Sequence, residues 1–453
     1  MKDSWIPDLD RIGGAKYLAI TDAISSAIES GELRAGDRLP PQRDLAGRLG
    51  VDLTTVTKAY DQARNRGLIA ARGRAGSFIL PRSAIAAGPP PRDTGMNMPP
   101  EIDGGSLLAA WERTTGALLR AKGANGRLHY VPAGGCEADR IAGTLIFERT
   151  GLACHPDQVV VTAGAQNALH AIVSATLQRG DTVACGAHVY PGFLALAKKA
   201  GLRLAPMARV DAAELEALCR RESVAALYVV PTNDNPTTAT LDKAQRADLA
   251  GVARRYGVVL IEDDAYGQLD RHPTLPLSSL APELGWYIAT TSKTISPALR
   301  VAHVGAPSLR QAMALAAAVH DTSVMAPPLN AALVTCWVED GSYDRLIAET
   351  RAEGVRRQSI AAETLPRNSY AAHPCGYHLW VPLGADASAA QVAASLAGAG
   401  ITAISADSFT PGKSAAPAVR VSLGGPIKEA GIRRSLTMLA MFLSAGRQSP
   451  RLI

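Results

Sequence analysis

The sequence predicts an α/β protein in which a small, mostly helical domain precedes a large domain of alternating strands and helices. From about Gly105 onward, short apolar runs typical of buried strands alternate with longer helical segments. The first 80 residues instead contain three short helical patterns and a hairpin-like stretch. A proline-rich segment lies between the two regions. We therefore place the domains at residues 1–80 and 105–453, with a linker over residues 81–104.

Length and composition indicate a folded protein with a large core. The 453 residues leave room for two or three domains, and 47% of them are hydrophobic against 19% charged. No apolar run approaches the roughly 20 residues that a membrane span requires, and the first residues lack the pattern of a secretion signal. The six cysteines include no close pair typical of a zinc or redox motif. We expect a cytoplasmic protein with free thiols and no membrane partner.

Positive charge is concentrated near the N-terminus. Between Arg34 and Arg82 the chain has ten lysines and arginines but only four acids, a net charge of +6. The whole chain also has a net charge of +6, so the remainder is close to neutral. A basic segment on a neutral body indicates a polyanionic partner for that segment.

The local patterns of the first 80 residues predict three helices and a hairpin. An isoleucine at every fourth position marks a helix over 17–30. A second, short helix spans 42–49, with proline at its start and glycine just past its end. The third spans 52–66, with aspartate as its N-cap. A basic hairpin follows over 68–80.

Three helices and a basic hairpin predict a winged helix-turn-helix that binds double-stranded DNA. The third helix would enter the major groove, while arginines on the second helix and on the hairpin would neutralise phosphates. A small helical domain used for protein contacts is the alternative, and the location of the charge favours DNA. The candidate DNA-binding residues are Arg43, Thr54, Thr55, Lys58, Arg72 and Arg74.

Three motifs of this region resemble the DNA-reading domain of GntR-type bacterial regulators. They are GDRLPPQRDLA at 36–46, LGV at 49–51 and TVTKAY at 55–60, and the resemblance covers about the first 80 residues. It implies that the residues matching Arg43, Thr54, Thr55 and Lys58 lie at the DNA, together with the wing glycine that matches Gly76.

The linker is identified by its composition. Six prolines fall between Pro81 and Pro100, with few apolar side chains and no periodicity. Such a stretch is typical of a semi-extended spacer rather than a core element. At about 3.1 Å per residue, it could span roughly 60 Å and reach a neighbouring subunit.

The strand-like runs of the large domain alternate with helical segments. The runs cover 158–162, 182–185, 225–230 and 258–261, and the helices that follow the first three cover 165–178, 191–200 and 242–256. Continuous apolar strands between helices predict a largely parallel sheet. Ligands bind at the carboxyl ends of the strands of such sheets, where the candidate site residues fall.

The stretch ATTSKTISPALR at 289–300 suits a pyridoxal phosphate site. The amine of Lys293 can form a Schiff base with the cofactor aldehyde. The hydroxyls of Thr290 and Ser292, with Arg300, can hold the phosphate. The alternative is a surface loop rich in serine and threonine that happens to contain a lysine. Residues elsewhere in the chain are needed to distinguish the two interpretations.

Two turns supply further candidates for holding the cofactor. Gly164, Ala165 and Gln166 open a helix directly after a strand, where backbone N–H groups and the helix dipole attract a phosphate. Tyr190 lies at a strand-to-helix turn and could stack on the pyridine ring, although a lone tyrosine there is more often a packing residue.

Three polar residues could contact the ring and one the substrate. Asp263 ends a buried-looking strand, and its carboxylate could keep the pyridine nitrogen protonated. Tyr266 and Asn235 could reach the phenolic oxygen. Arg420, inside a strand-like run, suits a substrate carboxylate, with a surface-edge arginine as the alternative. The adjacent acids could also indicate a metal, but no histidine cluster accompanies them, and we expect none.

These pieces in this order resemble the fold-type I pyridoxal phosphate enzymes, the aspartate aminotransferase superfamily, over about residues 105–445. The resemblance implies that Lys293 forms the internal aldimine and that the other residues take the roles described above. It adds Tyr130, which matches a tyrosine that reaches the phosphate of the partner subunit. Two positions depart from the pattern: Thr238 stands where the family usually has glycine, and Thr290 where serine is common.

The whole chain resembles MocR-type bacterial regulators, which join a GntR-type reader to an aminotransferase-like domain. The resemblance implies a homodimer whose effector is pyridoxal phosphate or its adduct with an amine or amino acid. We predict a transcriptional regulator that binds operator DNA and senses the cofactor or an amino compound through aldimine chemistry at Lys293. A working aminotransferase with a secondary DNA-binding domain stays open, as does a cofactor reservoir. The basic first domain favours regulation, since catalysis alone gives no reason for it.

Overall fold

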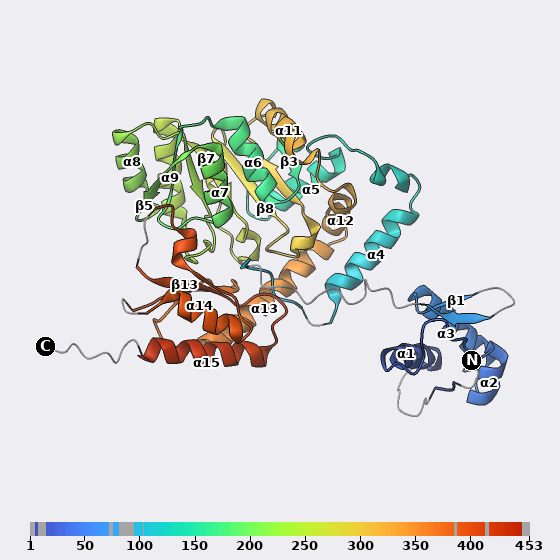
Figure 1. The fold of residues 1–453 in the computed structure, drawn as a ribbon. Helices are drawn as coiled ribbons and strands as arrows, with labels where there is room; N and C mark the ends of the chain where they lie inside the picture. Colours follow the sequence, from blue (N-terminus) through green and yellow to red (C-terminus); the bar gives the residue numbers. More distant parts are fainter. Residues whose placement is uncertain are drawn as a thin grey trace. The chain divides into compact units, whose positions relative to one another are not determined.

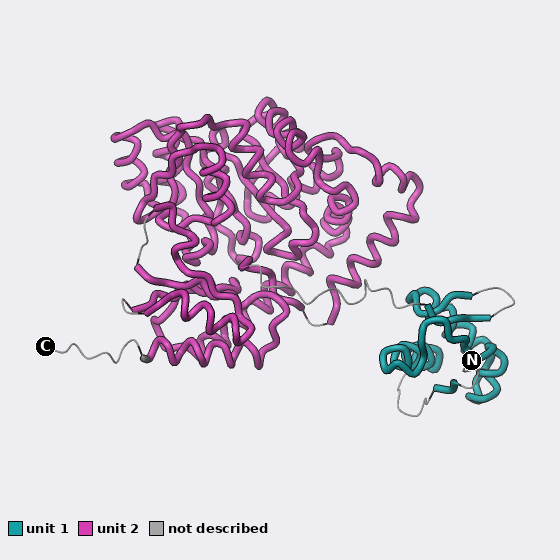
Figure 2. Tube along the Cα trace, viewed as in Figure 1, with its two compact units in different colours: residues 1–94 teal, residues 95–453 magenta. Residues whose placement is uncertain are grey.

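The computed structural model describes residues 5–7, 15–71, 76–80, 95–102, 104–384, 387–412 and 416–445. The chain forms two compact units, Met1–Thr94 and Gly95–Ile453, which Figure 2 distinguishes by colour. The second unit thus begins ten residues before Gly105, where the sequence predicts the large domain to begin. Residues 81–94 of the predicted linker lie outside the described residues.

The first unit is a three-helix domain with a two-stranded antiparallel hairpin (Figure 1). Its elements are α1 (Lys16–Glu29), α2 (Gln42–Leu49), α3 (Leu53–Asn65), β1 (Ile69–Ala71) and β2 (Ser77–Ile79). Gly50 ends α2 as predicted, with a φ of +59° that favours glycine. Ile20, Leu45, Val56 and Tyr60 bring the three helices together in one buried core. The predicted winged helix-turn-helix is confirmed.

The second unit is built on a seven-stranded sheet with the strand order β3-β9-β8-β7-β6-β4-β5. The strands are β3 (Val159–Thr162), β4 (Thr182–Gly186), β5 (Arg203–Met207), β6 (Ala226–Val229), β7 (Val259–Asp263), β8 (Gly285–Thr290) and β9 (Ala302–Gly305). All neighbouring pairs are parallel except those of β9, which runs antiparallel to β3 and β8. The predicted largely parallel sheet is confirmed.

Helices cover both faces of this sheet, because alternate residues of one strand pack into different cores. On β3, Val161 packs in a core with Leu333, whereas Val160 packs in another with Leu169. The helices are α4 (Ser106–Arg120), α5 (Glu137–Glu148), α6 (Ala165–Thr176), α7 (Pro191–Ala200), α8 (Ala212–Arg221), α9 (Lys243–Tyr256), α10 (Leu277–Leu280), α11 (Leu309–Ser323), α12 (Pro328–Glu339) and α13 (Ser342–Thr364). Short 3-10 turns are η3 (Ala124–Leu128), η4 (Pro156–Gln158), η5 (Gly267–Leu269), η6 (Pro297–Leu299) and η7 (Ala406–Phe409). Among the described helices, none has the length and apolarity needed to cross a membrane.

A second, antiparallel sheet has the strand order β10-β11-β13-β12. Its elements are β10 (Ala371–Ala372), β11 (His378–Pro382), β12 (Ala403–Ser405) and β13 (Ala418–Ser422), with α14 (Ala389–Gly398) and α15 (Glu429–Ala445) beside them. Arg420 lies on the interior strand β13 and is only 2% exposed, so the alternative of a surface-edge arginine is wrong.

Residues 95–102, here called the strap, begin the second unit and pack against the rest of it. Pro100 bridges to Gly425, and the backbone N–H of Glu101 donates to the Gly425 oxygen at 3.1 Å. Asn97 is 1% exposed. The sequence predicts a spacer here because residues 81–100 contain six prolines, few apolar side chains and no periodicity, but the paired backbone and the buried asparagine make the strap part of the large unit.

Candidate functional site

A cavity of about 80 Å³ lies at the carboxyl ends of the strands of the large sheet. β6, β7 and β8 lead into it from neighbouring positions in the sheet, as expected for a ligand site in an α/β domain. Ten of the predicted cofactor residues line it: Ala165, Gln166, Tyr190, Asn235, Asp263, Tyr266, Thr290, Ser292, Lys293 and Arg300. The structure therefore gathers residues that are up to 135 positions apart in the sequence.

Lys293 lies in the turn that follows β8, and its amine faces the strap. The Nζ atom donates a hydrogen bond to the backbone oxygen of Asn97 at 2.6 Å. Burial, together with the positive charges of Arg420 and Arg300, lowers the pKa of the Lys293 amine to about 8, while Asp263 opposes the shift. An amine with this pKa is neutral in a sizeable fraction of molecules near neutral pH, which makes it a usable nucleophile.

Asp263 ends β7 with one carboxylate oxygen satisfied and one free. Its Oδ2 accepts a hydrogen bond from the Tyr228 hydroxyl at 3.1 Å. The buried Oδ1 has no hydrogen-bond partner among the described residues. Burial raises the pKa of Asp263 to about 6, and the Tyr228 hydrogen bond opposes this rise. A buried carboxylate with one open oxygen suits a cationic N–H donor, such as a protonated pyridine nitrogen.

The opposite end of the cavity is suited to an anion. Gly164 precedes α6 with a φ of +85°, and a Cβ there would lie 2.8 Å from Nη2 of Arg300. Glycine is therefore required for the approach of Arg300, whose Nη2 also donates to the Ala163 oxygen at 3.1 Å. The first N–H groups of α6 lack intrahelical partners and attract negative charge. The buried hydroxyl of Ser292 has no partner among the described residues and can donate to a phosphate.

Asn235 and Tyr266 line the cavity, and each is hydrogen-bonded to a residue outside it, Asn235 to Arg420 and Tyr266 to Asn97. Arg420 donates to Asn235 Oδ1 at 3.1 Å and to the strap through the Gly95 oxygen at 2.7 Å. The Tyr266 hydroxyl accepts from Asn97 Nδ2 at 3.0 Å. Arg420 does not line the cavity itself but lies behind Asn235.

Thr238 departs from the family pattern, whereas the position of Tyr130 is compatible with it. Thr238 takes a φ of +64°, a left-handed conformation that costs a β-branched residue on the order of 1–2 kcal/mol relative to glycine. This agrees with the usual glycine at that position. Tyr130 is 84% exposed and does not line the cavity of its own chain.

The site also includes three residues that the sequence analysis did not identify: Asn97, Tyr228 and His378. The Asn97 side chain donates to Tyr266, accepts from Ser422 Oγ at 2.7 Å and contacts His378 Nδ1 at 3.3 Å. Asn97 was not identified because it lies in a segment whose composition predicts a spacer. Tyr228 was not identified because it lies within the apolar run of β6. No local signal marks His378, whose Nε2 lies 3.1 Å from the Asp234 backbone oxygen.

Four of the candidate DNA-binding residues lie on the second and third helices of the first unit. Arg43 on α2 and Thr54 and Lys58 on α3 are exposed, and Thr55 is half-buried. A hydrogen bond of 2.9 Å from Thr57 to Gln42 joins the two helices. Gly76 has a φ of +105°, and a Cβ there would lie 2.9 Å from Nε of Arg38, so the start of β2 requires glycine. Arg72 and Arg74 lie outside the described residues.

Comparisons with known proteins agree with both units. Residues 16–79 match the family of bacterial regulatory proteins, gntR family, and residues 123–424 match aminotransferase class I and II. The chain is 26% identical to the uncharacterized HTH-type transcriptional regulator YdeF of Bacillus subtilis, over 97% of each chain. It is 29% identical to the vitamin B6 salvage pathway transcriptional repressor PtsJ of Salmonella typhimurium, over 82% of this chain and 86% of that one.

A solved structure shares the fold of the large unit. The crystal structure of LysN, the alpha-aminoadipate aminotransferase of Thermus thermophilus, superposes with a TM-score of 0.68. The match covers 78% of this chain and 92% of LysN at 24% identity.

The charges around Lys293 predict opposite effects of two conservative substitutions. Asp263→Asn removes a negative charge and should lower the pKa of the Lys293 amine below about 8, whereas Arg300→Gln removes a positive charge and should raise it. The pH dependence of acetic anhydride labelling, followed by mass spectrometry on cofactor-free protein, measures both shifts. Labelling of the exposed Lys243 is the internal reference. Shifts of the same sign in the two variants would contradict this electrostatic arrangement.

Proposed function

The chain belongs to the class I and II aminotransferase family, and on that premise we propose that it is a pyridoxal phosphate-dependent, DNA-binding transcriptional regulator. The predicted combination of a GntR-type reader and an aminotransferase domain is confirmed. One observation carries the proposal: Lys293 and Asp263 line a single cavity in a chain whose first unit is a winged helix-turn-helix.

The open groups of the cavity fit pyridoxal phosphate. The unpartnered Oδ1 of Asp263 suits the ring nitrogen, and the α6 N-terminus, Ser292 and Arg300 suit the phosphate. Tyr190 also lines the cavity. When bound, the cofactor supplies an aldehyde that condenses with primary amines.

The side chains of the site have separate tasks in this proposal. Asp263 holds a proton at the ring nitrogen, because Tyr228 keeps one carboxylate oxygen hydrogen-bonded and the carboxyl therefore ionises more readily. Lys293 supplies the amine that competes with the effector amine. Arg420 is the candidate for an effector carboxylate, since its guanidinium is buried beside the cavity. The effector would thus be an amine or an amino acid.

Regulation is favoured over turnover by relatives that match most of this chain. YdeF, which matches 97% of this chain, is named as a transcriptional regulator, and PtsJ, which matches 82%, as a transcriptional repressor. Lysine, aspartate, tyrosine and arginine suited to transamination are all present, but an enzyme alone has no use for the DNA-binding unit.

The strap is our candidate for the route from the cavity to the DNA-binding unit. Its Asn97 oxygen accepts from Lys293, and its Gly95 oxygen accepts from Arg420, so it is held by the two groups that an effector would use. The strap begins at Gly95, the first residue of the second unit, directly after the end of the first unit at Thr94. An effector that engages Lys293 and Arg420 would exchange both bonds and change the restraint on the start of the second unit.

We also propose that the chain acts as a homodimer. Large apolar side chains are exposed on and just after α4: Leu108 by 74%, Leu119 by 46% and Leu128 by 66%. Tyr130 follows them with 84% exposure, which suits a residue that reaches the site of a second copy. Exposed large apolar side chains along one helix and the segment after it are compatible with a protein interface. A dimer would present two DNA-binding units to paired half-sites.

Lys293→Ala should abolish covalent attachment of the cofactor, because the variant lacks the only amine that lines the cavity among the described residues. The test incubates the protein with pyridoxal phosphate, reduces it with borohydride and locates the label by mass spectrometry. Lys243→Ala, which removes an exposed lysine on α9, is the matched control and should keep the label on Lys293. A stoichiometric label on the Lys293→Ala variant would refute the assignment.

Arg43→Ala should weaken binding to a DNA fragment from upstream of the protein's own gene. Loss of one phosphate contact should also reduce the slope of log K against log salt by about one. Fluorescence anisotropy over a series of salt concentrations measures both. Arg254→Ala removes an exposed arginine of α9 and serves as the control. An unchanged slope would remove Arg43 from the phosphate-contacting set, and failure of the unmodified protein to bind this DNA would count against regulation.

Asn97→Ala should release the strap, because the substitution removes the side-chain contacts with Tyr266, Ser422 and His378. At about 1 kcal/mol for each hydrogen bond, amide exchange over 95–102 should accelerate tenfold or more. Hydrogen-exchange mass spectrometry measures this. Met98→Ala, within the same strap, is the control and should exchange more slowly than Asn97→Ala. Equal exchange in the two variants would mean that Asn97 does not anchor the strap.

A further inference from the structure

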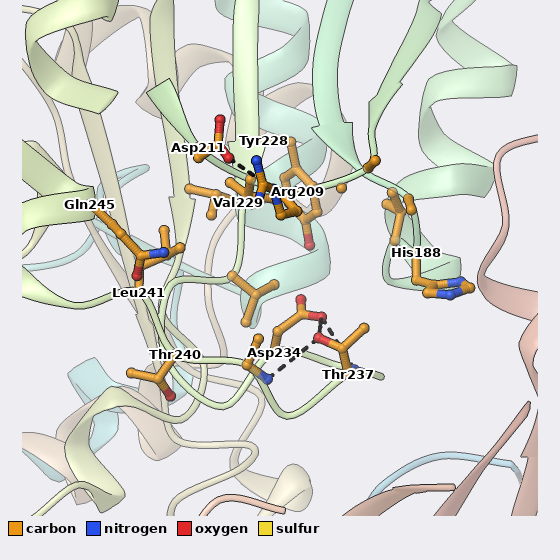
Figure 3. A pocket seen from close by; sticks show the side chains of 17 residues that line it. His188, Arg209, Asp211, Tyr228, Val229, Asp234, Thr237, Thr240, Leu241 and Gln245 are labelled. Carbon is orange, nitrogen blue, oxygen red and sulfur yellow. Dashed lines mark hydrogen bonds and ion pairs between the residues drawn. The ribbon is translucent and has the colours of Figure 1, made fainter. Parts of the chain in front are cut away.

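A second, larger cavity of about 430 Å³ lies at the carboxyl ends of β4, β5 and β6 (Figure 3). It is bordered by residues 186–189 after β4, by 208–211 after β5 and by the loop between β6 and α9. The volume falls within the range of small-molecule sites, and this edge of an α/β sheet is where ligands bind. Apart from Tyr228, whose hydroxyl donates to Asp263, none of the residues assigned above to the cofactor site or to DNA lines it.

The walls of this cavity are largely apolar, and its lining includes two carboxylates, Asp234 on the loop and Asp211 at the rim. Val189, Val210 and Val229 contribute to the walls, while Asp234 and Thr237 stand together on the loop (Figure 3). The Asp234 Oδ2 accepts from the Thr237 hydroxyl at 2.6 Å and from its backbone N–H at 3.3 Å. No lysine, arginine or histidine among the described residues forms an ion pair with Asp234. The carboxylate is thus oriented but not neutralised.

The other ionisable groups of the lining do not neutralise the negative charge of Asp234. Arg209 is at the rim with its side chain 80% exposed, and its Nε pairs with Asp211 at 3.2 Å and with Glu214 at 3.9 Å. Burial lowers the pKa of His188, which favours its neutral form. An anion would therefore meet an arginine that already has two acidic partners, whereas a cation would find a free carboxylate in apolar surroundings.

We propose that this cavity binds a small organic cation, an alkylammonium whose N–H donates to Asp234 and whose hydrocarbon part contacts the valine walls. The cavity is large enough for a short chain of this kind. This site is separate from the one at which an amine would react with the cofactor. The inference therefore goes beyond the proposed function and does not depend on it.

Two residues connect this cavity with the cofactor cavity. Val230 lines both, and Tyr228 lines the larger cavity while its hydroxyl donates to Asp263 in the smaller one. The negative charge of Asp234 raises the pKa of both Tyr228 and Asp263. A bound cation would offset that charge and so stabilise the ionised form of Asp263. Occupation of the second cavity would therefore lower the pKa of Asp263, the carboxyl group that would face the cofactor ring.

A tertiary amine cannot condense with an aldehyde. It therefore distinguishes binding in this cavity from reaction with the cofactor. Calorimetric titration of the full chain without cofactor, using N,N-dimethylbutylamine hydrochloride above the pH at which Asp234 titrates, should give saturable binding. Asp234→Asn keeps the shape and the acceptor for Thr237 but loses the charge, and should weaken binding roughly tenfold or more. Asp211→Asn removes a carboxylate from the rim while asparagine still caps α8, and should change the affinity less than about twofold.

Several results would overturn the proposal. These are no saturable binding of the amine, equal binding by Asp234→Asn and the unmodified protein, or equal weakening by Asp211→Asn, which would indicate unspecific charge attraction. Binding of butyrate in place of the amine would show that the class of ligand is wrong. If Asp234→Asn does not fold, Thr237→Val removes the hydroxyl that orients Asp234 and should weaken binding severalfold, and unchanged affinity there would equally refute the site. None of these outcomes depends on DNA or on the cofactor.

Discussion

Three consecutive buried carboxylates at the end of β7 are the constraint on which the large unit depends. Charged groups are rarely buried unless they are paired, so each needs its own compensation. Glu262 accepts from the backbone N–H groups of Leu277 and Ser278, both at 2.9 Å, and lies 3.9 Å from the buried Arg246. Asp264 accepts from Tyr287 at 3.0 Å. Burial still raises the pKa of Glu262 to about 7, so its charge is only partly compensated.

Strand geometry separates the middle carboxylate from its neighbours. Successive side chains of a strand point to opposite sides, so Asp263 lines the cavity while Glu262 and Asp264 do not. Arg246 fixes this end of the sheet by donating to the backbone oxygens of Leu241, Thr274 and Pro231. Asp263 is thus held on a rigid strand with one oxygen open, which is the pre-organisation that a cofactor site needs. The charge state of Asp263 can still change, because the hydrogen bond from Tyr228 affects the pKa of its carboxyl group.

The parts of the site that could be predicted are those with a local sequence signal. Lys293 stands among hydroxyls, and Asp263 ends an apolar run, so residue type and position in the α/β pattern suffice. Asn97 has no such signal, because its partners Tyr266 and His378 are 169 and 281 residues away. Contacts at that separation follow from the packing of the two sheets and not from periodicity. Arg420 was predicted as a ligand for a carboxylate, but its bonds to Asn235 and Gly95 could not be.

The proposed route through the strap would require only a small change in free energy. Coupling between two sites in regulated proteins is typically about 1–3 kcal/mol, equivalent to roughly a 5–150-fold change in affinity. The bonds from Lys293 to Asn97 and from Arg420 to Gly95 involve charged donors, each contributing about 1.5–3 kcal/mol. In this proposal, loss of one or both bonds is of the same order as the coupling free energy that a regulatory response needs, without any rearrangement of the sheet. Because both donors are also the groups suited to an amine and a carboxylate, an amino acid could act on the strap with both of its ends, whereas a simple amine could displace only the Lys293 bond. The same geometry thus gives a physical basis for distinguishing the two classes of effector.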